Sequence, residues 1–246
     1  MKNPGYLPKL LARWVILTVF ISLLLFVAAG TTQLLSLRNY LATFAAFQLA
    51  TMLAIDPGLA KERSSTLEKT GTPGRFAAGL SFLATLTVAA FDVGRLHWLH
   101  SVPLDARRIC LVLFAGAMAL EMWAMIVNPF FSPEIRLQSE RGHKLVACGP
   151  YRLLRHPGYL AMLVAVPASA LAIGSWLALV PAAAFCLTIL KRVGAEEAFL
   201  QQKLPGYGEY MGKVRGRLFP RIVFLRHPCQ ELVSSNSASH GDRRRP

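Results

Sequence analysis

Long uncharged apolar stretches occupy much of the first half of the chain. Residues 14–37, 39–55 and 76–91 contain no Asp, Glu, Lys or Arg, and residues 109–127 contain only Glu121. A helix that crosses the hydrocarbon core of a bilayer needs roughly 20 mostly apolar residues. Each stretch therefore predicts one transmembrane helix. The first stretch also exceeds the roughly 7–15 apolar residues of a signal peptide, so we interpret it as a membrane span.

The longest uncharged stretch, residues 156–190, is too long for a single crossing. Gly174 and Ser175 lie at its centre, which predicts a turn there. We expect a helical hairpin of two short spans, which makes about six transmembrane helices, or five if the hairpin only re-enters the membrane. The sequence thus predicts an all-α, polytopic integral membrane protein in contact with the lipid bilayer.

The charge of the chain is strongly asymmetric. Hydrophobic residues make up 54% of the sequence and charged residues 16%, and 27 Lys and Arg against 13 Asp and Glu give a net charge of +14. With the N-terminus in the cytoplasm, the predicted spans place all basic residues on the cytoplasmic side except Arg38, Arg95, Arg107 and Arg108. This bias predicts that both termini are cytoplasmic. It also explains the basic composition without a nucleic-acid partner.

The spans divide the chain into three predicted regions. Residues 1–128 form a four-helix transmembrane region, residues 129–225 a catalytic region with the hairpin, and residues 226–246 a disordered basic tail. We expect residues 57–74 to be a polar cytoplasmic connector.

Several isolated polar residues also carry predictions. Asp92 can pair with Arg95 three residues later. Glu121 could line a cavity or hydrogen-bond a neighbouring helix, and the sequence leaves both open. The four cysteines form no C-x-x-C pair, so we expect buried or incidental thiols, without a disulfide framework or a metal site. These residues are Cys110, Cys148, Cys186 and Cys229.

Two polar segments flank the predicted hairpin, at residues 132–159 and 191–200. Because a hairpin returns the chain to the same membrane face, we expect these segments to meet. His156 and Tyr159 lie at the start of a helix whose first turn accommodates Pro157, and such a helix start suits an anionic ligand group. Arg192 and Glu196 share a helix face. Taken singly, this pair could be a surface ion pair and the nearby basic residues could be membrane anchors.

Taken together, these segments resemble the isoprenylcysteine carboxyl methyltransferase family of integral membrane methyltransferases, to which phospholipid methyltransferases are related. The resemblance rests on RGHKLVACGPYRLLRHPGY at 141–159, R-x-x-x-E-E at 192–197, L-P-G-Y-x-x-Y at 204–210 and VRGRLFP at 214–220. It implies S-adenosylmethionine as the cofactor. It also implies cofactor contacts from Gln138, His143, Lys144, Leu145, Val146, Tyr151, His156, Pro157, Gly158, Tyr159 and Glu196.

The resemblance further implies a direct, in-line methyl transfer at the cytoplasmic membrane face to a lipophilic acceptor. Arg192 would bind and orient an acidic acceptor, and Glu197 would be the nearest general base if the acceptor were an amine. Carboxylate O-methylation fits the family best. Phospholipid N-methylation and thiol S-methylation remain alternatives, followed by an NADPH-dependent reductase of the sterol-reductase type and a non-catalytic membrane protein.

Overall fold

The computed structural model describes residues 6–68 and 73–220, and the predicted basic tail at 226–246 lies outside the described residues. Within them the chain is all-helical, without a β-strand. Its longer helices are α1 (Tyr6–Ala29), α2 (Leu35–Ala54), α3 (Pro57–Glu68), α4 (Pro73–Phe91), α5 (Leu104–Val127), α6 (Pro157–Ile173) and α7 (Leu179–Lys203). The short elements are the π-helical turn η1 (Asp92–Leu96), the 3-10 turns η2 (Ser139–Arg141) and η3 (Gly149–Arg152), and α8 (Tyr207–Lys213).

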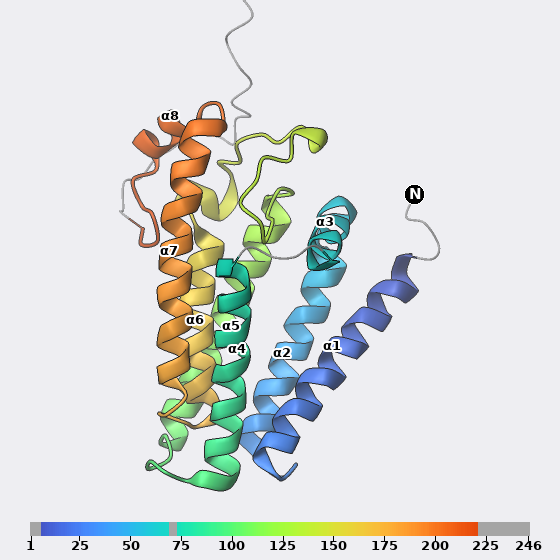
Figure 1. Ribbon diagram of the computed structural model, residues 1–246, viewed down its shortest axis with the longest axis vertical. Helices are drawn as coiled ribbons and strands as arrows, with labels where there is room; N and C mark the ends of the chain where they lie inside the picture. The colour runs from blue at the N-terminus through green and yellow to red at the C-terminus, as the bar shows by residue number, and fades with distance from the viewer. Residues whose placement is uncertain (1–5, 69–72, 221–246) are drawn as a thin grey trace, which may run out of the picture.

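The helices form a bundle in which α5 packs against α6, and α4 against α7. The α1–α2 pair stands beside these four helices, and α1 leans away from them towards its N-terminus (Figure 1). Helices α3 and α8 lie at the same end of the bundle (Figure 1). The buried core between α1, α2, α4, α5 and α6 includes Tyr40 and Phe114, whose ring centroids are 4.9 Å apart.

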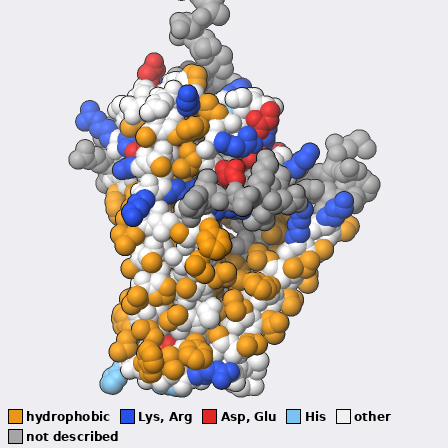
Figure 2. Space-filling view, viewed as in Figure 1, with side chains coloured by type: hydrophobic (Ala, Val, Ile, Leu, Met, Phe, Trp, Pro, Cys, Tyr) orange, Lys and Arg blue, Asp and Glu red, His pale blue; other side chains and the backbone are white. Residues whose placement is uncertain are grey.

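The outside of the bundle is apolar. Large hydrophobic side chains such as Ile16, Phe76, Val112 and Val180 are exposed. Hydrophobic side chains cover much of the face that Figure 2 shows. Among the described residues, three helical segments are long and apolar enough to cross a membrane, namely Pro8–Ala29, Gly74–Leu96 and Leu104–Val127. Helix α6 is a shorter apolar helix. The predicted helices are therefore present, whereas the number of six spans stays a prediction.

The turn between α6 and α7 lies where the sequence predicts it. Helix α6 ends at Ile173, and Gly174 follows with a φ of +122°. Residues with a Cβ rarely adopt this backbone conformation, so glycine suits the turn. The Ser36 hydroxyl of α2 donates to the carbonyl of Ile173 at 2.8 Å and ties α2 to this end of α6. The two polar segments that flank the hairpin thus return to the same end of the bundle, as expected.

The structure adds to one local prediction and corrects two. The expected connector after Asp56 contains a helix, α3, which runs from Pro57 to Glu68. The first uncharged stretch, 14–37, contains the end of α1 and the start of α2 rather than one helix. Cys148 is disulfide-bonded, although we expected an incidental thiol, whereas Cys110 and Cys186 are free.

The predicted Asp92–Arg95 pair is wrong. Asp92 is buried and accepts hydrogen bonds from the Ser175 hydroxyl at 2.6 Å and from the Trp98 backbone N–H at 3.2 Å. Arg95 instead donates to the carbonyls of Ala28 and Val27 at the end of α1. The π-helical turn changes the spacing of a regular helix, and the carbonyls of the last turn of α1 lie within reach of Arg95.

We expect Gly94→Ala to destabilise the protein by about 1–3 kcal/mol, the usual range for overpacking. A Cβ at Gly94 would lie 2.2 Å from the backbone oxygen of Ala29, so α1 and η1 would have to separate. Gly116→Ala in α5 is the matched control, because a Cβ there meets no atom within 4 Å. Thermal unfolding in detergent should give a lower Tm for Gly94→Ala and an equal or higher Tm for Gly116→Ala. Equal melting temperatures for Gly94→Ala and the unmodified protein would contradict the close contact.

Candidate functional site

A cavity of about 730 Å³ extends from the polar end of the bundle into its apolar interior. Its polar part is lined by residues of the segment 128–146, by the start of α6, by the last turns of α7, and by α8. Its apolar part is lined by α1, α4, α5, α6 and α7, with side chains such as Phe20, Phe82, Met118 and Phe185. The volume lies within the range of about 300–1,000 Å³ that is typical of ligand sites.

The cavity brings together eleven of the residues predicted from the sequence. They are His143, Lys144, Leu145, Val146, Tyr151, His156, Pro157, Gly158, Tyr159, Arg192 and Glu196. Gln138 and Glu197 do not line it. The first four come from an extended loop, Tyr151 from η3, the next four from the start of α6, and the last two from α7.

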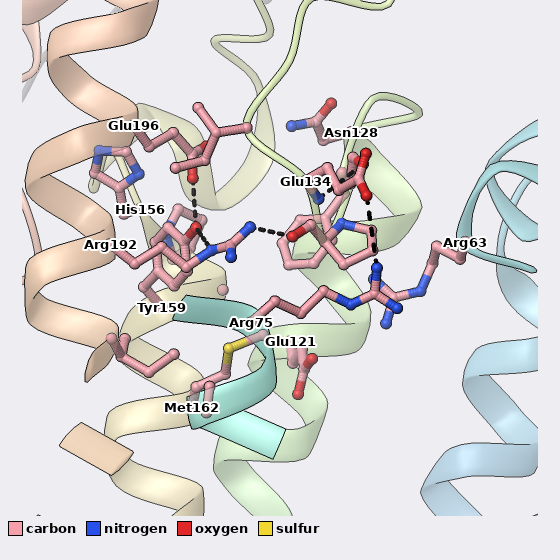
Figure 3. A pocket seen from close by; sticks show the side chains of 18 of the residues that line it. Arg63, Arg75, Glu121, Asn128, Glu134, His156, Tyr159, Met162, Arg192 and Glu196 are labelled. Carbon is pink, nitrogen blue, oxygen red and sulfur yellow. Dashed lines mark hydrogen bonds and ion pairs between the residues drawn. The ribbon is translucent and has the colours of Figure 1, made fainter. Parts of the chain in front are cut away.

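A row of hydrogen bonds runs along one wall of the cavity (Figure 3). The Tyr159 hydroxyl donates to Glu196 Oε2 at 2.5 Å and accepts from Arg192 Nε at 2.9 Å. Arg192 Nη2 donates to the carbonyl of Pro133 on the facing loop. The row fixes the orientation of the Arg192 guanidinium and holds a carboxylate next to it, so both an anionic and a cationic ligand group can be bound here.

Glu197 forms the centre of an ion-pair cluster outside the cavity. Its Oε1 lies 2.7 Å from Arg155 Nε and 3.3 Å from His156 Nε2, and its Oε2 lies 2.8 Å from Arg217 Nε. Burial favours the neutral acid, but hydrogen bonds from His156 and Arg155 outweigh it and lower the pKa of Glu197 to about 2. A carboxylate with such a pKa is a weak base at neutral pH.

The same cluster attaches the C-terminal segment to the start of α6. The backbone N–H groups of Arg155 and His156 donate to the carbonyls of Gly216 and Arg217 at 2.9 and 3.1 Å. Arg155 Nη1 also donates to the carbonyl of Val214 at 3.0 Å. The segment therefore supports the turn that presents His156 to the cavity.

Gln138 supports the cavity loop from behind. It is fully buried, its amide nitrogen donates to the carbonyl of Phe130 at 2.9 Å, and its Oε1 accepts from Arg141 Nη1 at 2.5 Å. Its backbone N–H donates to His143 Nδ1 at 3.3 Å, and the His143 ring stacks on Phe130 with centroids 4.5 Å apart. Burial and the nearby Arg141 lower the pKa of His143, so the imidazole is neutral at neutral pH.

Two tyrosines join α8 and η3 to this frame. The Tyr210 hydroxyl donates to the carbonyl of Tyr151 at 2.7 Å, and the Tyr151 hydroxyl accepts from Asn128 Nδ2 at 3.2 Å. The first of these bonds uses the Tyr210 hydroxyl of the L-P-G-Y-x-x-Y segment to support the cavity wall.

The sequence analysis did not assign to the site several charged side chains that lie on α3, on α4 and on the loop after α5. Arg63, Arg75 and Glu134 line the cavity, and Arg75 Nη1 lies 3.7 Å from Glu134 Oε1. Glu121 also lines it, which answers the question that the sequence left open. The charge of Glu121 within an apolar stretch was the only such signal in the sequence. Among the described residues, no three His, Cys, Asp or Glu side chains gather as a metal site would require.

Comparison with known proteins links this geometry to one family. The model of the isoprenylcysteine carboxyl methyltransferase (ICMT) family matches residues 108–202. Two proteins of Oryza sativa, from subspecies indica and japonica, are each named "Probable protein-S-isoprenylcysteine O-methyltransferase". Each is 32% identical to this chain over 112 residues, which are 44% of this chain and 57% of the relative.

The chain thus aligns with a little over half the length of the curated relatives that it matches. The match confirms the resemblance over the motifs at 141–159 and 192–197, and it extends the resemblance to most of α5. The segments at 204–210 and 214–220 lie beyond the matched residues, so their part in the resemblance stays a prediction.

Proposed function

We propose that this protein is an S-adenosylmethionine-dependent methyltransferase that acts on a lipophilic acceptor at the cytoplasmic face of a membrane. The observation that carries the proposal is the convergence of eleven motif residues on a single cavity that is polar at one end and apolar at the other. Its support in known proteins is the match of residues 108–202 to the ICMT family. The excess of Lys and Arg at this end of the bundle favours its cytoplasmic placement.

The residues present fit the proposed cofactor. Lys144 can hold an amino-acid carboxylate, Glu196 can accept from hydroxyl groups or attract an ammonium group, and Leu145 and Leu200 offer apolar contact to a flat base. All four line the same cavity. When bound, S-adenosylmethionine would supply an electrophilic methyl group on a positively charged sulfur. The protein would contribute position and orientation, which for a two-reactant step can remove about 7–11 kcal/mol of the barrier.

Arg192 is placed to orient an acidic acceptor. Hydrogen bonds with the Tyr159 hydroxyl and the Pro133 carbonyl fix its guanidinium, which lines the same cavity as the apolar side chains described above. An acceptor carboxylate held there needs no general base, because it is a nucleophile in its charged form. The apolar chamber would take the lipid part of the acceptor and exclude water, which strengthens the electrostatic contacts. Carboxylate O-methylation is therefore the reaction that this arrangement favours.

We expect the purified protein to bind S-adenosylhomocysteine and to show no affinity for NADPH, measured by calorimetry in detergent. His156→Ala should weaken S-adenosylhomocysteine binding about tenfold or more, because His156 lines the cavity and is held by Glu197. Lys213→Ala on α8 is the control, because this exposed residue does not line the cavity. Failure of the unmodified protein to bind S-adenosylhomocysteine, or binding of NADPH in its place, would contradict the proposal.

A further inference from the structure

Two polar side chains lie among the apolar helices that line the cavity. Glu121 belongs to α5 and Gln48 to α2, and both line the cavity. Glu121 also lies within Leu104–Val127, one of the segments that are long and apolar enough to cross a membrane. A carboxylate or an amide at this depth costs free energy unless a partner satisfies it, so such side chains usually serve a function. The function proposed above gives neither of them a role.

The two side chains lie at the same level of the bundle. Helices α2 and α5 pack against each other, and both run towards the polar end (Figure 1). The rings of Tyr40 on α2 and Phe114 on α5 are in contact, with centroids 4.9 Å apart. Gln48 follows Tyr40 by eight residues, and on the other helix Glu121 follows the phenylalanine by seven. At a rise of about 1.5 Å per residue, both therefore lie about 10–12 Å closer to the polar end than this ring contact.

Helical spacing turns both side chains towards the cavity. On α5, Phe114, Met118 and Glu121 are separated by four and three residues, and all of them line the cavity. On α2, Phe44 and Gln48 are four residues apart and also line it. Residues three and four apart share one face of a helix. The carboxylate and the amide therefore belong to the same wall as the apolar side chains around them.

Neither side chain has a hydrogen-bond or ion-pair partner among the residues that the structure describes. Both are partly buried, and their polar atoms are accessible. The charge of Glu121 raises the pKa of Arg63 on α3, but the two groups form no contact within 4 Å. The lone pairs of the Glu121 carboxylate are thus available to a donor that enters the cavity.

A plain hydrocarbon chain is a poor occupant for this part of the cavity. It would displace water from Glu121 and Gln48 without replacing the lost hydrogen bonds, and such unsatisfied groups are costly. A hydroxyl group on the chain would donate to the carboxylate and accept from the Gln48 amide, as the displaced water does. An ammonium group suits the place less well, because the positive charge of Arg63 already acts on the same carboxylate.

This place is separate from the position of the reacting carboxylate. Arg192 lies on α7, where it bonds to the Tyr159 hydroxyl and the Pro133 carbonyl. In Figure 3, Glu121 lies on α5 and lower in the view than Arg192. When Arg192 holds the acceptor carboxylate, the group that meets Glu121 therefore belongs to the lipid part of the acceptor.

We propose that Glu121 and Gln48 form a hydroxyl-binding subsite, which selects acceptors whose lipid part carries a hydroxyl group away from the carboxylate that is methylated. The inference rests on the proposed function. It narrows the substrate class of that function to hydroxylated long-chain acids, in place of acids with a plain hydrocarbon chain.

The test measures the binding of long-chain acids to the purified protein by calorimetry in one uncharged detergent. The probes are stearate, a series of hydroxystearates with the hydroxyl at successive positions along the chain, and the methoxy ether of each. We expect at least one hydroxystearate to bind about tenfold more tightly than stearate, because it adds a hydrogen bond to a charged group. Its methoxy ether accepts but cannot donate, so it should bind no more tightly than stearate.

Substitutions at Glu121 identify the partner of the hydroxyl. Glu121→Met should abolish the preference for the hydroxystearate over stearate, whereas Glu121→Gln should retain part of it, because the amide oxygen still accepts. Gln48→Leu should weaken the preference. Asp105→Asn is the matched control and should keep the preference, since this exposed carboxylate at the start of α5 does not line the cavity. Each probe enters the detergent equally with every variant, so a changed preference reports on the protein.

Thermal unfolding separates a ligand-binding role from a structural one. Because Glu121 has no partner in contact, Glu121→Met should have a Tm equal to or higher than that of the unmodified protein. A clearly lower Tm would make Glu121 a structural residue and would overturn the subsite.

The binding data overturn the subsite in several ways. Equal affinities for stearate and every hydroxystearate, equally tight binding of the methoxy ether, or an unchanged preference in Glu121→Met would each do so. Loss of the preference in Asp105→Asn would do so as well. Binding of S-adenosylhomocysteine is measured beside these probes. Its absence in the unmodified protein would contradict the proposed function, whereas its presence without a hydroxyl preference would contradict the subsite alone.

Discussion

Arg192→Met is expected to lower kcat/KM for methyl transfer by about 10²–10³-fold, the usual effect of losing one preorganised donor to the reacting group. The side chain keeps its volume but loses the guanidinium that Tyr159 and Pro133 hold in place. Tyr159 retains its bond to Glu196, so the cofactor wall should stay intact. The affinity for S-adenosylhomocysteine should therefore change by less than about threefold, which corresponds to less than about 0.7 kcal/mol.

Lys191→Met is the matched control for this variant. Lys191 is the preceding residue on α7, is exposed and does not line the cavity. Initial rates and calorimetric affinities should be close to those of the unmodified protein. Normal turnover by Arg192→Met would remove Arg192 from the acceptor site, whereas a parallel loss of turnover and cofactor affinity would make it part of the cofactor wall.

Glu197→Ala should be the most destabilising substitution at the site, by about 3 kcal/mol, because it leaves the largely buried Arg155 guanidinium without its carboxylate. Glu197 contacts Arg155, His156 and Arg217, and these contacts fasten residues 214–217 to the start of α6. Thermal unfolding should show a clearly lower Tm, with weaker S-adenosylhomocysteine binding because His156 loses its support. Glu209→Ala, an exposed carboxylate on α8, should leave both unchanged.

The pH dependence distinguishes support from proton transfer at Glu197. Its pKa is lowered from 4.5 to about 2, so the stability that it contributes is present above pH 4.5 and is lost as the pH falls towards 2. We infer that Glu197 is a positioning residue. The kcat/KM of the unmodified protein should then show no ionisation of this carboxylate above pH 5. If Glu197→Gln retained full stability and lost only an acid limb of the pH–rate profile, the residue would be a base.

The sequence was sufficient for the helices and for the residues of the cavity that lie in short motifs. The charge-free stretches predict the helices, because a helix needs apolar side chains both against lipid and in the interior of a bundle. The Gly174–Ser175 break within the longest stretch predicts the hairpin. His143, His156 and Arg192 were identified because the motifs retain their order and spacing. The helix boundaries were less accurate, since α1 ends at Ala29 inside a stretch that contains no charged residue.

The remaining features depend on contacts between distant parts of the chain. Gln138 and Glu197 belong to the predicted set, yet neither lines the cavity. Glu197 follows Glu196 on α7 and points in a different direction, and the Gln138 side chain bonds to the Phe130 carbonyl and to Arg141. Arg63 and Arg75 were counted as cytoplasmic charge, and only the packing of α3 and α4 brings them to the cavity. Asp92 accepts a hydrogen bond from Ser175 and does not pair with Arg95, because η1 departs from the spacing of a regular helix.

The central claim is tested most directly by transfer of a radiolabelled methyl group from S-adenosylmethionine into a membrane lipid extract by the purified protein. The account predicts a labelled lipophilic product from which mild alkaline hydrolysis releases the label as methanol, as it does from a methyl ester. Arg192→Met should not form this product. A product whose label resists alkali would indicate N- or S-methylation. No labelled product from extracts of the native membrane, with protein that is folded by its Tm, would contradict the account.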